Sequence, residues 1–321
     1  MGKHILRRVL ISIPTLLIIS VLVFAILAIA PGDPMAQFAA NPAVPPEVRE
    51  NIRRSLGLDQ PWPIRYVKWL IAAAQGDLGY SFQSKVPVMD LLLLKLPNTL
   101  AVLGVAYVLS VILALPLGVI SAVKRYSLFD HAATSFAFIG FSIPTFFTGI
   151  LLILVFSVKL RWLPFLYDSQ VTVSITDPSS VVAQLRQTIM PIAVLTLFQT
   201  ATLTRYMRSE MLEHLPLDYV RTARAKGLTE RIVVLRHVFR NSLIPVVTLV
   251  ALGIPTVFAG ALITEQIFAI PGIGSLLISA IDNSDTPVVM GATFIYAVLV
   301  VLFNLIADIL YAVLDPRIRY D

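Results

Sequence analysis

Long apolar stretches separated by polar segments dominate the pattern of the chain. The first, Val9–Ala30, has no charged residue over 22 positions. As a helix it is roughly 33 Å long, enough to cross a bilayer core of about 30 Å. Five later stretches also lack Lys, Arg, Asp and Glu: Asn98–Val123, His131–Val158, Gln187–Thr204, Asn241–Thr264 and Thr286–Ala307. The pattern predicts an all-α integral membrane protein with six transmembrane helices.

The first apolar stretch also has features of a cleaved signal peptide, because Ala28-Ile29-Ala30 resembles a cleavage site. The stretch is longer than the roughly 7–15 residues of a signal h-region. In addition, Pro31 should hinder cleavage. We therefore expect an uncleaved first helix. Prolines inside the later stretches predict kinks, which a helix bundle tolerates: Pro116, Pro144, Pro191, Pro245 and Pro255.

The polar segments divide the chain into parts. Residues 1–30 hold the N-terminal segment and the first helix, and residues 31–97 form a long polar segment with a helical piece near Pro63–Ala74. This segment is either a mobile loop or a small extracytoplasmic subdomain on the membrane face. We expect the subdomain, because the segment carries apolar and aromatic residues that suit packing and a membrane interface. These residues are Leu56, Leu58, Trp62, Tyr66 and Trp69. Residues 98–315 form the core, and residues 316–321 a cytoplasmic tail.

The longest polar interruption of the second half, Met211–Pro245, contains a short helix signal. Asp218 falls in the first turn, Arg224 and Lys226 fall in the last, and Gly227 is placed to stop the helix. Thr222, Ala223 and Ala225 give it no bulky apolar face. A helix of about nine residues is too short to be stable alone in water. We therefore expect something outside the helix to hold it, and the small residues to allow a partner a close approach.

Composition supports the membrane interpretation and indicates an orientation. The chain is 57% hydrophobic and 14% charged, against about 25% charged residues in globular proteins. Its net charge of +6 does not require a nucleic acid partner, because basic residues gather on cytoplasmic loops. With the N-terminus inside, fifteen Lys and Arg lie on the cytoplasmic side and only three lie in the two shorter outer loops. Both termini and Met211–Pro245 are therefore expected inside the cell.

Motifs for catalysis or nucleotide binding are absent from the sequence. It contains no cysteine, no G-x-x-x-x-G-K-[ST] loop, no HExxH and no GxSxG. An ion-coupled carrier usually has ionisable groups at mid-membrane, but here Glu265, Asn304 and Asp308 lie towards the ends of spans. These residues could line a transport pathway or join two helices. Alternatively, they are ordinary polar groups at the membrane interface, which is the interpretation we favour for Asp308. Transport energy is therefore expected from another chain.

Several segments, in order, resemble the dipeptide/oligopeptide permease family of ABC importers. The stretch DYVRTARAKGLTERIVVLRHVFRNSLIPVVT is similar to the family's cytoplasmic signature loop, with Arg221-Thr222-Ala223 and Gly227 at the positions of its Glu-Ala-Ala and Gly. The resemblance extends from about residue 5 to residue 320. Its other motifs are LRRVLISIPTLLIISVLVF, APGDP, LGLDQPWPIRYVKWL, GDLGYSF, LPNTL, FSIPTFFTGILLI, FAIPGIGSLL and ADILYAVLDPRIRY.

The resemblance implies a non-catalytic permease of the bacterial inner membrane that forms half of a translocation path for peptides. Expected partners are a second homologous permease, two ATPase subunits that hold ATP and Mg²⁺, and an extracytoplasmic solute-binding protein. This chain itself is expected to bind no cofactor or metal. The implied coupling helix, which docks on an ATPase subunit, comprises Asp218, Tyr219, Arg221, Thr222, Ala223, Arg224, Ala225, Lys226 and Gly227.

Three alternatives stay open from the sequence. Within the same class, the cargo could be nickel chelates, glutathione, opines or oligosaccharides, which nothing in the chain separates from peptides. In a different class, the chain would be a secondary transporter or channel that works without ATPase partners. The third alternative is a membrane enzyme, which would need a buried nucleophile or a metal cluster. The basic residues Arg231 and Arg236 could simply face lipid headgroups.

Overall fold

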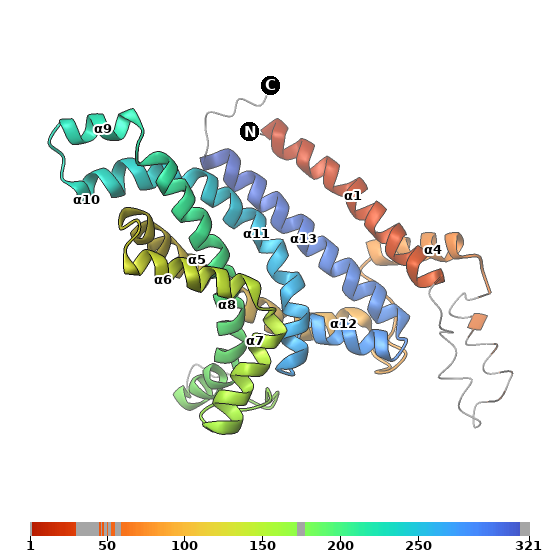
Figure 1. Ribbon diagram of the computed structural model, residues 1–321. Helices are drawn as coiled ribbons and strands as arrows, with labels where there is room; N and C mark the ends of the chain where they lie inside the picture. The colour runs from red at the N-terminus through yellow and green to blue at the C-terminus, as the bar shows by residue number, and fades with distance from the viewer. Residues whose placement is uncertain are drawn as a thin grey trace. The chain divides into compact units, whose positions relative to one another are not determined.

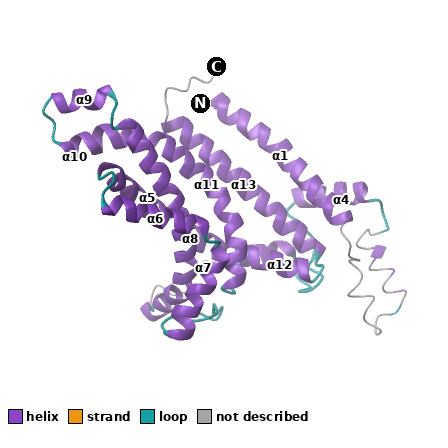
Figure 2. Ribbon diagram, in the orientation of Figure 1, coloured by secondary structure: helices purple, strands orange, loops and turns teal. Residues whose placement is uncertain are grey.

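A computed structural model describes residues 2–29, 45, 47, 50, 53–54, 59–171 and 177–314. Within these ranges the regular structure is helical, and the one β-bridge, between Tyr80 and Pro87, is isolated. Figure 2 shows helices joined by loops, with no strand in the part of the chain that it colours. The all-α prediction is therefore confirmed for the described residues.

The helices follow the apolar stretches and are labelled in Figure 1. Two of them continue as π-helical segments, η1 (Ile153–Lys159) after α7 and η2 (Val233–Val238) after α10. The α-helices are α1 (Gly2–Ile29), α4 (Trp62–Ala74), α5 (Val88–Val123), α6 (Leu128–Ser142), α7 (Thr145–Leu152), α8 (Pro178–His214), α9 (Asp218–Ala225), α10 (Glu230–Ile232), α11 (Phe239–Ile267), α12 (Ile273–Asp282) and α13 (Thr286–Leu314).

Five helical segments among the described residues are long and apolar enough to cross a membrane: Leu6–Ile29, Val88–Val123, Pro178–His214, Glu230–Ile254 and Thr286–Ile306. They correspond to five of the six predicted spans, and the first four begin before their charge-free stretches because the helices continue into polar flanks. A sixth span exists if the pair Leu128–Gly140 and Thr145–Lys159 is counted as one.

In the predicted span His131–Val158, the kink expected at Pro144 is a break between two helices. The chain bends by 102° between α6 and α7. Ile143 has the extended backbone angles φ −90° and ψ 124°, and Pro144 precedes α7. Proline disfavours helical angles in the residue before it and lacks the N–H of a continuing helix, so the break falls there. Pro191, in contrast, lies inside the uninterrupted α8.

The chain divides into two compact units, and the first comprises Met1–Ile5, Asn98–Pro271 and Leu302–Asp321. In this unit α8 packs against α6, α7 and α11. The helix α5 approaches α8 closely at Gly118, where an added Cβ would lie 2.6 Å from Met207 Cβ and 2.9 Å from the Thr204 carbonyl oxygen. Glycine at this position therefore permits the helix–helix contact.

The second unit comprises Leu6–Pro97 and Gly272–Val301. Its loop 79–87 is held by the buried Asp285, whose carboxylate accepts bonds from the Ser81 hydroxyl (2.5 Å) and from the backbone N–H groups of Phe82 (3.0 Å) and Gln83 (3.1 Å). Since burial of a carboxylate is costly without partners, these bonds fix the loop to the segment before α13.

The helix predicted near Pro63–Ala74 is confirmed as α4, in the second unit. Tyr66 and Trp69 of α4 pack against the ring of Phe24 on α1, and the Tyr66 hydroxyl lies 2.9 Å from the Ser20 hydroxyl. Two of the expected interface aromatics thus pack within the chain, while Trp62 is 41% exposed. Leu56 and Leu58, which we expected to pack in the same segment, lie outside the described residues.

Candidate functional site

The helix α9 connects α8 to α10 and stands beyond the end of α8 in Figure 1. Its ends follow the charges predicted from the sequence, with Asp218 in the first turn and Arg224 in the last. Gly227 has a φ of +74° and donates its N–H to the Arg224 carbonyl oxygen at 2.9 Å. Glycine adopts this left-handed angle without penalty, so the sequence stops the helix where expected.

One face of α9 is buried in the chain's own core. Val220 and Ala223, one turn apart, are 0% and 4% exposed. They belong to a cluster with residues of α5, α8, η2 and α11: Ala122, Met207, Met211, Val233, Val234, Val238 and Val246. The expectation that α9 lacks an apolar face is therefore wrong, and Ala223 is unavailable to a docking partner. The pattern was missed because two inward-facing apolar residues in eight are a weak signal.

The opposite face of α9 is exposed and small or charged. Asp218, Arg221, Thr222 and Ala225 follow helical spacing along it, and all four are exposed. The Asp218 and Arg221 side chains form an ion pair at 3.4 Å and are 95% and 71% exposed. The Thr222 hydroxyl donates to the Asp218 carbonyl oxygen at 2.9 Å. Because Thr222 and Ala225 are small, the helix surface between the charged side chains is open to close approach.

The turn after α9 is closed by a two-point ion pair. Arg224 Nε lies 3.1 Å from Glu230 Oε2, and Arg224 Nη2 lies 2.7 Å from Glu230 Oε1. The hydrogen bond to Glu230 raises the pKa of the Arg224 guanidinium above its ordinary value, so this side chain stays charged. Both side chains of this ion pair are exposed to solvent, which limits how much the pair stabilises the turn. The pair spans the turn that contains the exposed Lys226 and Gly227.

Tyr219, at the start of α9, faces the end of α8. Its hydroxyl lies 3.0 Å from Nδ1 of His214, and the two rings meet edge to face with centroids 6.2 Å apart. The side chain is half-buried. Tyr219 is therefore held within the chain and helps to position α9 on α8.

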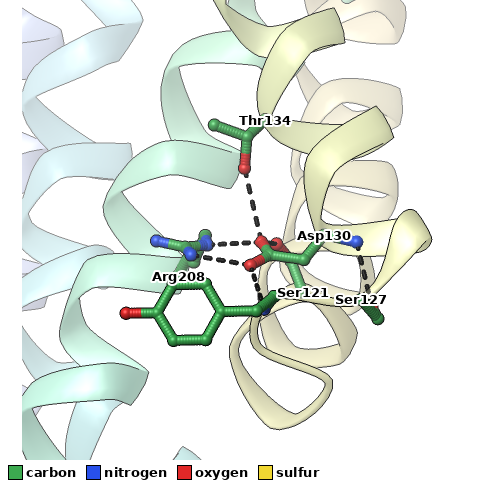
Figure 3. Close-up of polar contacts among 6 residues, drawn as sticks. Ser121, Ser127, Asp130, Thr134 and Arg208 are labelled. Atoms are coloured by element: carbon green, nitrogen blue, oxygen red, sulfur yellow. Dashed lines mark hydrogen bonds and ion pairs between the residues drawn. The ribbon is translucent and has the colours of Figure 1, made fainter.

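A buried ion pair on the same helix α8 was missed by the sequence reasoning. Arg208 donates from Nε to Asp130 Oδ1 (2.6 Å) and from Nη2 to Asp130 Oδ2 (2.8 Å), as Figure 3 shows. The Asp130 carboxylate also accepts the Ser121 hydroxyl and, at 2.9 Å, the Tyr126 N–H. A local signal existed, because Ser127 caps α6 and places Asp130 in its first turn.

The three predicted pathway residues lie on two helices. Glu265 of α11 is 1% exposed and accepts a hydrogen bond from the Thr99 hydroxyl of α5 at 2.6 Å, so it joins two helices. Asn304 and Asp308 are half-buried on α13. Among the described residues, no cluster of three His, Cys, Asp or Glu could hold a metal ion.

The sequence of the chain matches a known protein family. Residues 114–320 match the family model described as binding-protein-dependent transport system inner membrane component, and residues 1–103 match the model of its N-terminal part. The oligopeptide transport system permease protein AppB of Bacillus subtilis is 43% identical over 321 residues, covering 100% of both chains. The dipeptide transport system permease protein DppB of Escherichia coli is 37% identical, covering 100% of this chain and 99% of its own.

Solved structures show a similar fold. An inward-facing structure of the MetNI methionine ABC transporter has a TM-score of 0.56 at 19% identity, covering 71% of this chain and 97% of the solved one. The chain thus shares the fold of that solved chain. With the two family models and the full-length relatives, the chain belongs to the family of binding-protein-dependent transport system inner membrane components.

Proposed function

We propose that the chain is the permease subunit of an ATP-driven ABC importer of di- and oligopeptides. The observation that carries the proposal is the full-length similarity to AppB and DppB, whose names specify oligopeptide and dipeptide transport. The cargo class therefore rests on those relatives rather than on a binding pocket in this chain.

The role proposed for α9 is docking on an ATPase subunit. Its outward face of Asp218, Arg221, Thr222 and Ala225 supports this role, because small residues between charged ones permit close contact and polar pairing. The buried Val220 also supports it, since a helix that transmits movement has to be fixed to the helices it moves. Gly227 would turn the chain back towards the membrane without adding bulk on that side.

The proposed assembly contains a second homologous permease, two ATPase subunits and an extracytoplasmic binding protein. ATP and Mg²⁺ would be held by the ATPase subunits, and this chain would supply no catalytic residue. Both termini and α9 would face the cytoplasm of a bacterial cell, as the distribution of basic residues favours. Glu265, Asn304 and Asp308 would hold helices together or border the path.

The mechanism requires that docking differ between the two states of the transporter. A contact that is equal in both states shifts no equilibrium. Closure of the ATPase pair on ATP would move α9 as a rigid element. Val220 and Ala223 would pass that movement to α8 through Met207 and Met211, which share their core. The helices would then alternate between outward and inward access.

Reconstitution of the complex tests the proposal. The chain is co-purified with its partner permease, ATPases and binding protein and placed in proteoliposomes. Uptake of labelled di- and oligopeptides should require ATP and all the subunits, and this chain alone should transport nothing. Nickel chelates, glutathione, opines and oligosaccharides are measured in parallel.

Two results would overturn parts of the proposal. ATP-dependent uptake of one of the other cargoes, with none of peptides, would remove the cargo class and leave the importer. Transport by the chain alone, without ATPases, would remove the importer function and indicate a secondary transporter or channel.

A further inference from the structure

A cavity of about 230 Å³ lies between α6 and α8 in the first unit. It is smaller than the roughly 300–1,000 Å³ of pockets for drug-sized ligands, so its volume suits a compact chemical group. Its walls combine polar and apolar side chains. Those that matter here are Thr134 and Phe138 of α6 and Thr204, Arg205, Arg208 and Leu212 of α8.

Thr204 lines this cavity and carries a buried hydroxyl group. The residue is 4% exposed, and its Oγ1 has no hydrogen-bond partner among the described residues. Most buried polar side-chain atoms in proteins are hydrogen-bonded, because an unpaired one loses its bonds to water without replacement. A ligand oxygen in the cavity would give this hydroxyl a partner.

The charged side chains that line the cavity are basic. Arg205 and Arg208 belong to its wall, and none of the described residues that line it is acidic. The ion pair with Asp130 uses Nε and Nη2 of Arg208, and Figure 3 shows how the carboxylate holds that side of the guanidinium. A guanidinium has five N–H donors, so Arg208 retains Nη1 for a further acceptor. An anionic group with several oxygens would suit both arginines and Thr204.

The cavity lies where α8 changes from apolar to charged residues. Arg205 directly follows the charge-free stretch Gln187–Thr204. Phe138, on the same cavity wall, is 57% exposed, and Leu212 provides a second apolar group. An occupant therefore meets positive charge and apolar surface together, a combination that matches a phospholipid with an anionic headgroup and acyl chains.

We propose that this cavity binds the phosphate of an anionic phospholipid, with Arg205, Arg208 and Thr204 as its ligands. Basic pockets between transmembrane helices on the cytoplasmic side bind such headgroups in general. The leaflet assignment rests on the orientation proposed above, whereas the binding itself does not depend on orientation or on cargo. The bound lipid would join the outer surfaces of α6 and α8, the helices that Asp130 and Arg208 already connect.

Native mass spectrometry of the full-length chain tests the proposal. The chain is purified in mild detergent, exchanged into nanodiscs of phosphatidylcholine with a minor fraction of phosphatidylglycerol, and released for mass measurement. The wild type should retain phosphatidylglycerol in preference to phosphatidylcholine. Arg205→Gln should lower this retention about fivefold, since each basic side chain near an anionic lipid surface contributes a factor of that size.

Thr204→Val separates a ligand role from a packing role. The variant keeps the shape of the side chain and removes the unpartnered hydroxyl, so in phosphatidylcholine alone the chain should be as stable as the wild type or more stable. Retention of phosphatidylglycerol should nevertheless fall, by an amount on the order of tenfold, because a hydrogen bond to a charged oxygen is lost. Arg236→Gln, which removes an exposed basic residue of η2, is the matched control and should leave retention unchanged.

Three outcomes would overturn the proposal. The first is equal loss of phosphatidylglycerol in Arg205→Gln and Arg236→Gln, which would indicate general surface attraction. The second is unchanged retention in Thr204→Val. The third is binding of inorganic phosphate that displaces phosphatidylglycerol at millimolar concentration, which would make the cavity a site for free phosphate.

Discussion

Arg208 of α8 and Asp130 of α6 are joined by two hydrogen bonds, although 78 positions separate them in the sequence. The Asp130 side chain is 3% exposed and the Arg208 side chain is 24% exposed. Met207, the residue before Arg208, belongs to the core that holds α9. One turn of α8 therefore contacts both α6 and the proposed docking helix, and a force applied to α9 would reach α6 through it.

Asp130→Asn should destabilise the chain strongly. It leaves the guanidinium of Arg208 without its countercharge, and breaking a buried ion pair by removing one partner costs about 3 kcal/mol or more. The free energy of unfolding in detergent should fall accordingly. Asp218→Asn, which breaks an exposed pair on α9, is the control and should change it by less than about 1 kcal/mol. Equal effects would show that the buried pair contributes little.

Gly118→Ala should push α5 away from α8. The new methyl group would meet the Met207 side chain and the backbone of Thr204, and the backbone has little freedom to move. Overpacking of this kind costs about 1–3 kcal/mol, measurable as a lower melting temperature. Gly104→Ala on the same helix is the matched control, because none of the described residues lies within 4 Å of its added Cβ. If the two variants melt alike, the close approach of α5 and α8 is incorrect.

Gly227→Asp should abolish ATP-coupled import and leave membrane insertion intact. None of the described residues lies within 4 Å of a Cβ built at position 227, so a side chain there would extend towards a docked partner without a clash inside the described part of the chain. Aspartate tolerates the left-handed angle better than most residues, which limits the strain. Uptake and protein level are measured together in the reconstituted complex.

The control for this variant is Gly76→Asp in the second unit. Gly76 also has a positive φ, +87°, and also has nothing within 4 Å of its added Cβ. It should retain import, since backbone strain of the same kind arises there at a position that lies outside the proposed ATPase-docking helix and its turn. Wild-type uptake by Gly227→Asp would remove the docking claim for this turn.

Arg224→Glu should act more weakly than the glycine substitution. It places two carboxylates across the turn, but the pair with Glu230 is exposed, and such pairs contribute about 0–1 kcal/mol. Uptake should fall in part, and adding Glu230→Arg should restore it by rebuilding the pair in reverse. If the double variant transports no better than Arg224→Glu, then Arg224 acts by direct contact with a partner.

Local chemistry made much of this structure predictable. The charge-free stretches located the spanning helices, and Asp218, Arg224 and Gly227 located α9, because these signals lie within a few neighbouring residues. Kinks are expected from the sequence at both Pro144 and Pro191, but the chain breaks into two helices at Pro144, whereas α8 continues through Pro191. The two prolines are alike in sequence and differ in what surrounds them. A bundle can accept one proline within a helix and end a helix at another.

The contacts of the candidate site were less predictable. Ala223 was expected on the docking face because it is small, but its partners Met207 and Val233 come from α8 and η2. The sequence does not say which face of an eight-residue helix meets other elements when only Val220 and Ala223 are apolar and inward. Asp130 and Arg208 similarly lie near the ends of two different apolar stretches. They meet only because α6 packs against α8, which the sequence does not reveal.

The most direct test of the account is photo-crosslinking from the outer face of α9. The chain has no cysteine, so Thr222→Cys provides one labelling site for a benzophenone maleimide, and Val182→Cys at the other end of α8 provides the control. In the assembled complex, Thr222→Cys should form an adduct with an ATPase subunit whose yield changes on ATP addition, and Val182→Cys should form none. Adducts of Thr222→Cys with lipid alone, or with the same ATPase yield as Val182→Cys, would contradict the proposal that α9 couples the chain to ATP.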